Sequence, residues 1–173
     1  MKLKTVAQRT IGTTLGATVA LALGLFTSAP LATARAESIV IHDARGRDVT
    51  IGNTSRIVSV GGAITEILYA LGLQDRIVGI DTTSLYPPQA LGEKPNVGYM
   101  RQLSAEGVIG LNPQLILAIE RSGPKETLDV LDSAKIPFVS FPENQTEQGI
   151  IDKIKLVAHA MDTDTKKKKK RLA

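Results

Sequence analysis

The sequence contains 173 residues, of which 21 are Lys or Arg and 17 are Asp or Glu, so its formal net charge is +4 at pH 7. It contains no cysteine, which excludes disulfide scaffolds, thiol catalysis and cysteine-based zinc or iron–sulfur sites. Four basic residues fall within positions 1–36 and six within 166–171, so the stretch 37–165 carries eleven basic and 17 acidic residues. Its net charge of −6 excludes the basic surface that nucleic-acid binding requires, and we expect no nucleic-acid partner.

The first 36 residues have the pattern of a signal peptide. Three basic residues occur within the first nine positions, Ile11–Phe26 is largely apolar, and Ala34–Ala36 has the small-x-small form of a cleavage site. The apolar run is shorter than the ~20 residues of a membrane span, which favours a cleaved signal over an anchor. We expect the exported protein to begin at Glu37 and, without a cysteine for acylation, to diffuse in the periplasm.

Apolar periodicity predicts alternating strands and helices from position 38 onward. In chain order, the expected elements are a hairpin (38–43 and 48–51), a strand (56–60), a helix (63–71), a strand (76–80), a helix from 104, a strand (114–119), a helix (124–134), a strand (137–141) and a helix from 146. Such alternation predicts an α/β domain with a mainly parallel sheet and right-handed crossovers. Ligands of such sheets gather at the carboxyl ends of the strands.

The predicted organisation has four parts. A signal peptide covers 1–36, an α/β lobe covers 37–145, the start of a long helix covers 146–164, and a tail covers 165–173. The tail contains Lys166–Lys170 and Arg171, and such a run of like charges favours disorder. A lysine homopolymer that interrupts a helix also fits a reading-frame slip in an adenine-rich tract, and the natural protein would then continue beyond it.

The segment around Tyr99 holds the strongest candidate site. If this segment is extended, Tyr99 and Arg101 share one face of the strand. A guanidinium close to a phenol favours the phenolate, which is a better ligand for a ferric ion, and tyrosinate is one of the axial ligands that proteins use for haem iron. Ser104 is predicted to cap a following helix, with Glu106 in its first turn.

Other residues could also ligate iron or line a site. Met100 points away from Tyr99 in an extended segment, so we expect it to pack against the protein. The two histidines, His42 and His159, fall on the first hairpin and the last helix, where we expect structural or surface roles. Tyr86 precedes two prolines at a strand end and is a candidate for lining a ligand cleft.

A nucleotide-binding enzyme is a more distant interpretation of the same pattern. The strand, the Gly61-Gly62 turn and the helix superficially resemble a phosphate-binding turn. The G-x-G-x-x-G spacing and the G-x-x-x-x-G-K-[ST] motif are both missing, and no catalytic constellation stands out.

Four stretches of the sequence together identify a known family. They are Arg56–Gly72, Tyr86–Pro88, Val97–Gly107 and Leu111–Pro113. These stretches resemble the periplasmic haem-binding proteins of bacterial haem ABC importers. The first two are shared with the related cobalamin- and siderophore-binding proteins, whereas the Gly-Tyr-Met-Arg-x-Leu-Ser-x-Glu-Gly sequence resembles the haem subgroup. The similarity extends from about Ile39 to about Asp164.

The resemblance implies roles for three residues. Tyr99 would be the axial ligand of the haem iron, Arg101 would support its phenolate, and Glu106 would dock onto arginines of a membrane permease. Members of the family have two α/β lobes joined by one long helix, and they bind ligand between the lobes. The lobe at 37–145 would be the N-terminal one, and the helix from 146 would be the connector. The resemblance further implies a monomeric substrate-binding component, not an enzyme, that delivers haem to an inner-membrane ABC permease with its ATPase.

The second lobe of the family is missing from this sequence. One lobe can cover one face of a haem, and losing half of the buried area at ~25 cal/mol per Å² costs several kcal/mol. We therefore expect this chain to bind haem weakly. The alternatives are a binding protein for cobalamin or a ferric siderophore, and a truncated chain without function.

Overall fold

The computed structural model of the chain describes residues 38–161. The predicted signal peptide (1–36), the predicted tail (165–173) and the last residues of the predicted connecting helix (162–164) lie outside the described residues. Within 38–161, no helix combines the length and the apolar character that a membrane crossing needs.

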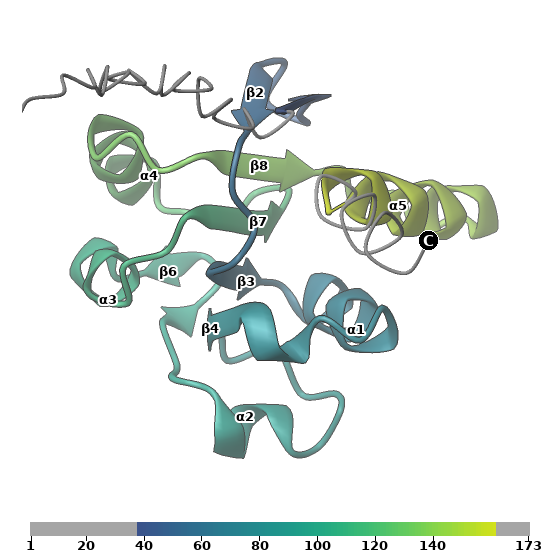
Figure 1. Cartoon of the computed structure of the whole chain (residues 1–173), viewed down its shortest axis with the longest axis horizontal. Coiled ribbons are helices and arrows are strands. Elements are labelled where there is room, and N and C mark those ends of the chain that lie inside the picture. Colours follow the sequence, from purple (N-terminus) through teal and green to yellow (C-terminus); the bar gives the residue numbers. More distant parts are fainter. Residues whose placement is uncertain (1–37, 162–173) are drawn as a thin grey trace, which may run out of the picture. The chain divides into compact units, whose positions relative to one another are not determined.

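The described residues form strands and helices that alternate along most of the chain (Figure 1). In order they are β1 (Ile39–His42), β2 (Asp48–Ile51), β3 (Ile57–Val60), α1 (Gly62–Ala70), η1 (Gln74–Arg76), β4 (Ile77–Ile80), α2 (Ala90–Glu93), β5 (Gly98–Tyr99), β6 (Gln102–Leu103), α3 (Ala105–Gly110), β7 (Leu115–Ile119), α4 (Lys125–Ser133), β8 (Phe138–Phe141) and α5 (Glu147–Ala160). The predicted first hairpin is confirmed, because β1 and β2 pair antiparallel.

The central sheet has four strands in the order β4-β3-β7-β8, and every neighbouring pair is parallel. All residues of β3, β7 and β8 are buried, as expected for strands that are covered on both faces. In Figure 1, α3 and α4 lie on one side of these strands and α1 and α5 on the other. The prediction of an α/β lobe with a mainly parallel sheet is confirmed.

Alternation along the strands divides the core into two layers. In β7, Leu115 and Leu117 belong to the cluster beneath α1 and α5, whereas Ile116 and Ala118 belong to the cluster beneath α3 and α4. Successive side chains of a strand point to opposite faces, so an entirely apolar strand supplies both layers at once. This explains why Gln114 is followed by five consecutive apolar residues.

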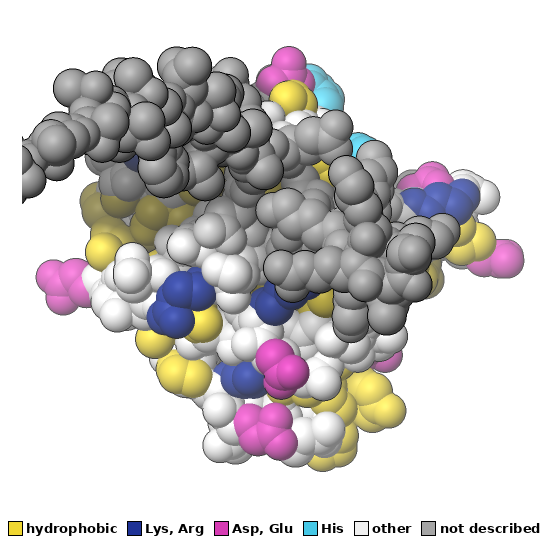
Figure 2. Space-filling view, viewed as in Figure 1, with side chains coloured by type: hydrophobic (Ala, Val, Ile, Leu, Met, Phe, Trp, Pro, Cys, Tyr) yellow, Lys and Arg dark blue, Asp and Glu magenta, His cyan; other side chains and the backbone are white. Residues whose placement is uncertain are grey.

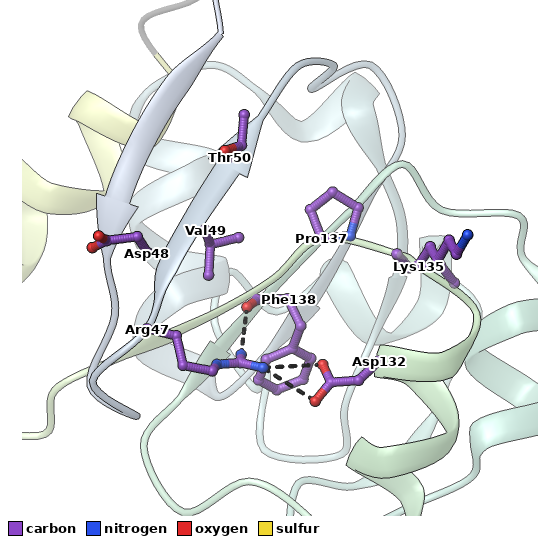
Figure 3. A pocket seen from close by; sticks show the side chains of 9 residues that line it. Arg47, Asp48, Val49, Thr50, Asp132, Lys135, Pro137 and Phe138 are labelled. Atoms are coloured by element: carbon purple, nitrogen blue, oxygen red, sulfur yellow. Dashed lines mark hydrogen bonds and ion pairs between the residues drawn. The ribbon is translucent and has the colours of Figure 1, made fainter.

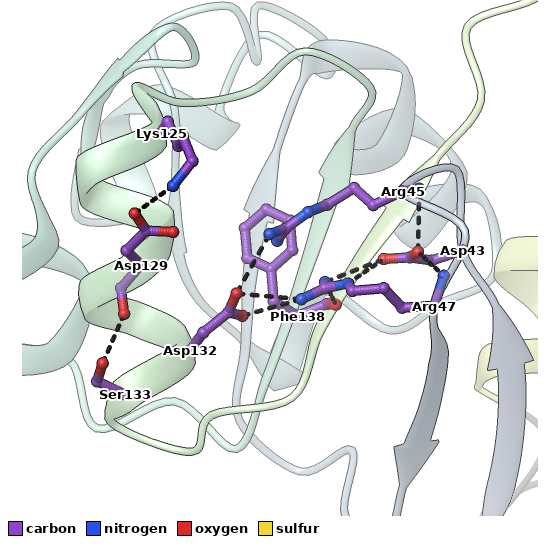
Figure 4. A network of polar contacts seen from close by, with 8 residues as sticks. All are labelled: Asp43, Arg45, Arg47, Lys125, Asp129, Asp132, Ser133 and Phe138. Atoms are coloured by element: carbon purple, nitrogen blue, oxygen red, sulfur yellow. Dashed lines mark hydrogen bonds and ion pairs between the residues drawn. The ribbon is translucent and has the colours of Figure 1, made fainter.

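The β1–β2 hairpin is attached to the sheet layer by two arginines of its loop (Figure 4). Arg47 donates from Nη2 to Asp43 Oδ2 and to the carbonyl oxygen of Phe138, both at 3.0 Å, and from Nη1 to Asp132 of α4 at 3.1 Å. Arg45 donates to the same Asp132 carboxylate at 3.2 Å, and its Cζ lies 5.6 Å from the centre of the Phe138 ring. Each of these cations is therefore matched by an acceptor.

A pocket of about 280 Å³ lies beside this attachment, between β2 and the connection from α4 to β8 (Figure 3). Val49 and Thr50 line it from the strand, and Pro137 lines it from the connection. Arg47 and Asp132 also line this pocket, and they are bonded to each other. We therefore assign these two residues of the pocket to the attachment of the hairpin.

Candidate functional site

The candidate site lies at the edge of the sheet where the parallel strands end, which we call the carboxyl edge. The chain that follows the β4 loop returns beside β4, where Ile80 donates its N–H to Pro95 and Val97 donates to Ile80, both at 2.9 Å. Directly afterwards, the Thr82 N–H donates to the carbonyl oxygen of Gly98 at 2.9 Å. These bonds bring the start of β5 to the end of β4, so the segment that carries Tyr99 lies at the carboxyl edge.

A buried carboxylate joins two loops of this edge. Asp81 has no exposed surface, and its Oδ1 accepts hydrogen bonds from the Gly61 N–H at 2.8 Å and from the Ser84 hydroxyl at 2.9 Å. Its Oδ2 accepts from the Thr83 N–H and hydroxyl at 3.0 and 2.6 Å. A Cβ on Gly61 would lie 2.8 Å from Cγ2 of Ile119, so glycine is required in this turn, where φ is 102°.

Three buried hydroxyls extend this network into the sheet. The hydroxyls of Ser59 and Thr65 lie 2.8 Å apart, and those of Thr65 and Ser84 lie 2.7 Å apart. Because each buried polar group has a partner, the β3–α1 turn and the β4 loop are fixed to each other. Sequence reasoning missed this network; the one available signal was Asp81 directly after an apolar strand.

The Tyr99 segment is a tight hairpin in which β5 and β6 pair antiparallel, with Tyr99 opposite Gln102 and the turn at Met100 and Arg101. The prediction that an extended strand places Tyr99 and Arg101 on one face is therefore wrong. The hairpin is stabilised by the neighbouring loop, because Gly123 donates its N–H to the Met100 carbonyl at 2.9 Å. Among the described residues, no hydrogen bond or ion pair joins Tyr99 to Arg101.

Large side chains at this edge are exposed to solvent. Tyr99 is 43% exposed, Tyr86 in the loop after β4 is 61% exposed, and its neighbour Leu85 is 69% exposed. Apolar and aromatic side chains that are exposed at a ligand-type edge can contact a flat apolar ligand. The phenol oxygens of Tyr99 and Tyr86 add two groups that could bind a metal or a polar atom.

Glu106 lies on the neighbouring helix and is exposed. The predicted helix cap is confirmed, because the Ser104 hydroxyl accepts a hydrogen bond from the Gly107 N–H at 3.0 Å. Glu106 sits in the first turn of α3, where the helix dipole favours an acidic side chain. On the face shown in Figure 2, acidic and basic side chains are interspersed and are not gathered by sign.

The other residues that could ligate iron have different surroundings. His42 is exposed and bonded through Nδ1 to Asp48 at 2.9 Å, and His159 is exposed on α5. Burial, together with the charge of Glu93, raises the pKa of Tyr69 and disfavours its phenolate. Within residues 38–161, no group of three or more His, Asp or Glu side chains is placed to hold a metal ion.

A single α/β lobe with a parallel sheet and clustered loops at its carboxyl edge defines a class of ligand-binding lobes. Residues 57–170 match the family described as periplasmic binding protein. The chain belongs to this family.

Three similar proteins illustrate the relationship. The uncharacterized ABC transporter substrate-binding lipoprotein YvrC of Bacillus subtilis (strain 168) is 34% identical over 131 residues, which are 74% of this chain and 41% of that protein. A vitamin B12-binding protein of Vibrio cholerae serotype O1 (strain ATCC 39315 / El Tor Inaba N16961) is 34% identical over 105 residues, which are 60% of this chain and 37% of that protein. The solved structure of the periplasmic heme-binding protein RhuT from Roseiflexus sp. RS-1 is 40% identical, with a TM-score of 0.61 over 65% of this chain and 43% of that one.

The chain thus spans about two fifths of the length of these relatives, which agrees with one lobe of a two-lobe protein. Two of them are named for a ligand, and the two ligands differ. Haem and vitamin B12 each contain a large metal-binding macrocycle, and the family match by itself does not choose between them.

Proposed function

We propose that this chain is the N-terminal lobe of a periplasmic substrate-binding protein that binds haem and delivers it to an inner-membrane ABC importer. The observation that carries the proposal is Tyr99, an exposed phenol on a hairpin fixed at the carboxyl edge. Support comes from the haem-binding RhuT, to which this chain is 40% identical over the covered part. The proposed activity is capture and release of haem, without a chemical reaction.

Tyr99 would provide the bond to iron. A phenolate oxygen is a hard, anionic ligand that suits ferric iron, and tyrosinate serves as an axial haem ligand. The pairing of Tyr99 with Gln102 and the bond from Gly123 to Met100 hold this residue in place. A fixed ligand loses little conformational entropy when iron binds, which favours affinity.

Three further residues take the roles that the sequence predicts. Tyr86 would contact the haem face from the β4 loop. Arg101 would support the phenolate of Tyr99 through its charge, from the turn of the hairpin and not from the same strand face. Glu106 would contact the permease from the first turn of α3, as an exposed acid that can pair with a basic surface.

Cobalamin binding is the second candidate, because the Vibrio cholerae vitamin B12-binding protein is 34% identical to this chain. Tyrosinate ligation of ferric haem gives a Soret band with a charge-transfer band, whereas cobalamin has its own, different spectrum. Competition between haem and cyanocobalamin for the chain separates the two candidates.

The test is a titration of the purified chain with ferric haem, monitored in the Soret and charge-transfer bands. We expect a tyrosinate spectrum with weak affinity, because one lobe covers one haem face. Tyr99→Phe removes the ligand oxygen and should abolish that spectrum. Tyr69→Phe is the matched control, since it deletes the same atom from a half-buried helix residue and should leave the spectrum unchanged.

Two results would overturn the proposal. The first is an identical spectrum from Tyr99→Phe, which would place the iron ligand elsewhere. The second is the absence of a specific haem complex from a chain whose circular dichroism shows it to be folded.

A further inference from the structure

The backbone of Arg121 is unusual for its position. Among residues 38–161, three non-glycine residues have positive φ angles, namely Asn112 (48°), Arg121 (66°) and Lys135 (57°). Asn112 and Lys135 directly follow the C-caps of α3 and α4, where left-handed residues are common. Arg121 instead follows strand β7, so no helix end explains its conformation.

The surrounding hydrogen bonds hold the backbone of the β7–α4 loop on both sides of Arg121. Before it, the Glu120 N–H donates to Phe141 at 2.7 Å. After it, the buried Ser122 donates from its hydroxyl to the Ile119 carbonyl at 2.7 Å. Non-glycine residues that are held in such a conformation by their neighbours cluster at functional sites.

The guanidinium of Arg121 is available for a ligand. The side chain is exposed, and within residues 38–161 it makes no hydrogen bond or ion pair. Within residues 38–161 no ion pair joins it to the adjacent Glu120, whose carboxylate accepts the Glu143 N–H at 3.2 Å.

Hydrogen bonds join the loop of Arg121 to the Tyr99 hairpin. The hydrogen bond from Gly123 to Met100 joins the two loops, and Leu103 donates its N–H back to the Gly123 carbonyl at 2.9 Å. Arg121 is two residues from this junction and Arg101 is one residue from it, so less than about 8 Å of chain separates either arginine from it. The backbones of two exposed arginines therefore lie near the point where the two loops meet.

We propose that Arg121, together with Arg101, binds carboxylate groups at the rim of the ligand. This inference rests on the proposed function and sharpens it. Haem carries two propionate carboxylates at its rim, whereas the rim of cobalamin carries neutral amides. A pair of arginines without acidic partners favours the anionic rim, because charge-assisted hydrogen bonds to carboxylates are strong and bidentate.

The test compares Arg121→Gly with Lys135→Gly in the whole chain, using ferric haem and its dimethyl ester as probes. Both substitutions remove one exposed cation and relieve one left-handed residue, but Lys135 lies at the end of α4. We expect Arg121→Gly to weaken haem binding about tenfold and to leave ester binding unchanged. Its urea midpoint should stay equal or rise, because glycine adopts this φ without strain. Lys135→Gly should leave both affinities unchanged.

The outcomes separate this inference from the proposed function. Equal loss of haem and ester affinity in Arg121→Gly, or no loss at all, overturns the role of Arg121 while Tyr99-dependent binding stands. A fall in the urea midpoint with loss of both probes would assign Arg121 to the fold. A chain without a Tyr99-dependent haem spectrum overturns both proposals together.

Discussion

Arginines occupy two regions of this lobe in opposite ways. At the β1–β2 hairpin, Arg45 and Arg47 share the Asp132 carboxylate, and Arg47 also bonds to Asp43, whose side chain is fully buried. At the carboxyl edge, Arg101 and Arg121 are exposed and make no such bond within the described residues. Arginine side chains thus attach one element to another in the first region. In the second region they are available to contact a ligand.

The presence or absence of carboxylate partners separates structural from functional arginines in a chain without a bound ligand. A guanidinium whose donors are satisfied by carboxylates contributes to stability and has little to offer a ligand. A guanidinium on a rigid loop without partners contributes little to stability, and its charge is free to act on a ligand. The following predictions test this division.

We expect the largest loss of folding stability from a substitution of Asp81. This residue tests whether the carboxyl edge, which carries the unpaired arginines, is rigid. Asp81→Asn places an amide donor against groups that already donate, so we expect the free energy of unfolding to fall by about 3 kcal/mol. Urea denaturation monitored by circular dichroism measures the change. Asp75→Asn, at an exposed position, is the control. A loss below about 1 kcal/mol would show that the edge does not depend on this carboxylate.

The next largest loss of stability is expected at the attachment of the β1–β2 hairpin. Arg47→Met leaves the buried Asp43 without its cation, and we expect a loss of about 2 kcal/mol in the free energy of unfolding, moderated by the partial exposure of Arg47. Arg101→Met should change stability by less than about 0.5 kcal/mol in the same assay. Equal effects of the two substitutions would contradict the division.

The stabilising contribution of the Arg47–Asp43 pair should also depend on pH. Burial by itself would raise the pKa of Asp43, but hydrogen bonds from Arg47 and its positive charge hold this pKa below the usual 3.8. A depressed folded-state pKa means that ionised Asp43 stabilises the fold above pH 3.8, and that this contribution is lost as the pH falls through the folded value. The difference in stability between the original chain and Arg47→Met should therefore narrow as the pH falls below 3.8. A constant difference across that range would count against the pairing.

The smallest effect concerns the helix that carries Glu106. Ser104→Ala removes the cap of α3, and we expect a loss of about 1 kcal/mol. Ser133→Ala, which removes a hydroxyl bonded to the Asp129 carbonyl near the end of α4, is the control and should have a smaller effect. Urea midpoints measured side by side distinguish the two.

Sequence reasoning recovered the frame of the lobe because apolar periodicity reports burial. The wholly apolar Leu115–Ile119 predicts a strand with two covered faces, and Ser104 predicts a capped helix; both are confirmed. The helix predicted at 63–71 ends where expected, and Gly72 follows it with a φ of 70°, which glycine adopts readily. These features depend on neighbours in the sequence, so the sequence alone is sufficient to predict them.

The missed features depend on partners that are distant in the sequence. The turn at Met100 and Arg101 is stabilised by Gly123, and nothing in the Tyr99 segment itself announces that contact. Asp81 binds Gly61 across twenty positions, and Arg47 binds Asp132 across 85. The local sequence pattern carries no information about such distant pairs. The hairpin attachment and the buried network could therefore not be predicted and became visible only in the structure.

The order of strands in the sheet has a consequence for folding kinetics. Strand β3 pairs with β4 through Ile57 and Ile77, but its other neighbour begins at Leu115. The Tyr99 hairpin lies inside the loop that this second, long-range pairing closes. Closing long loops before non-local contacts form is slow, so we expect β3 and β7 to pair late. The contact between Gly123 and Met100 closes a much shorter loop of the chain. The same reasoning therefore allows the Tyr99 hairpin to form before the central pair of the sheet on which it rests.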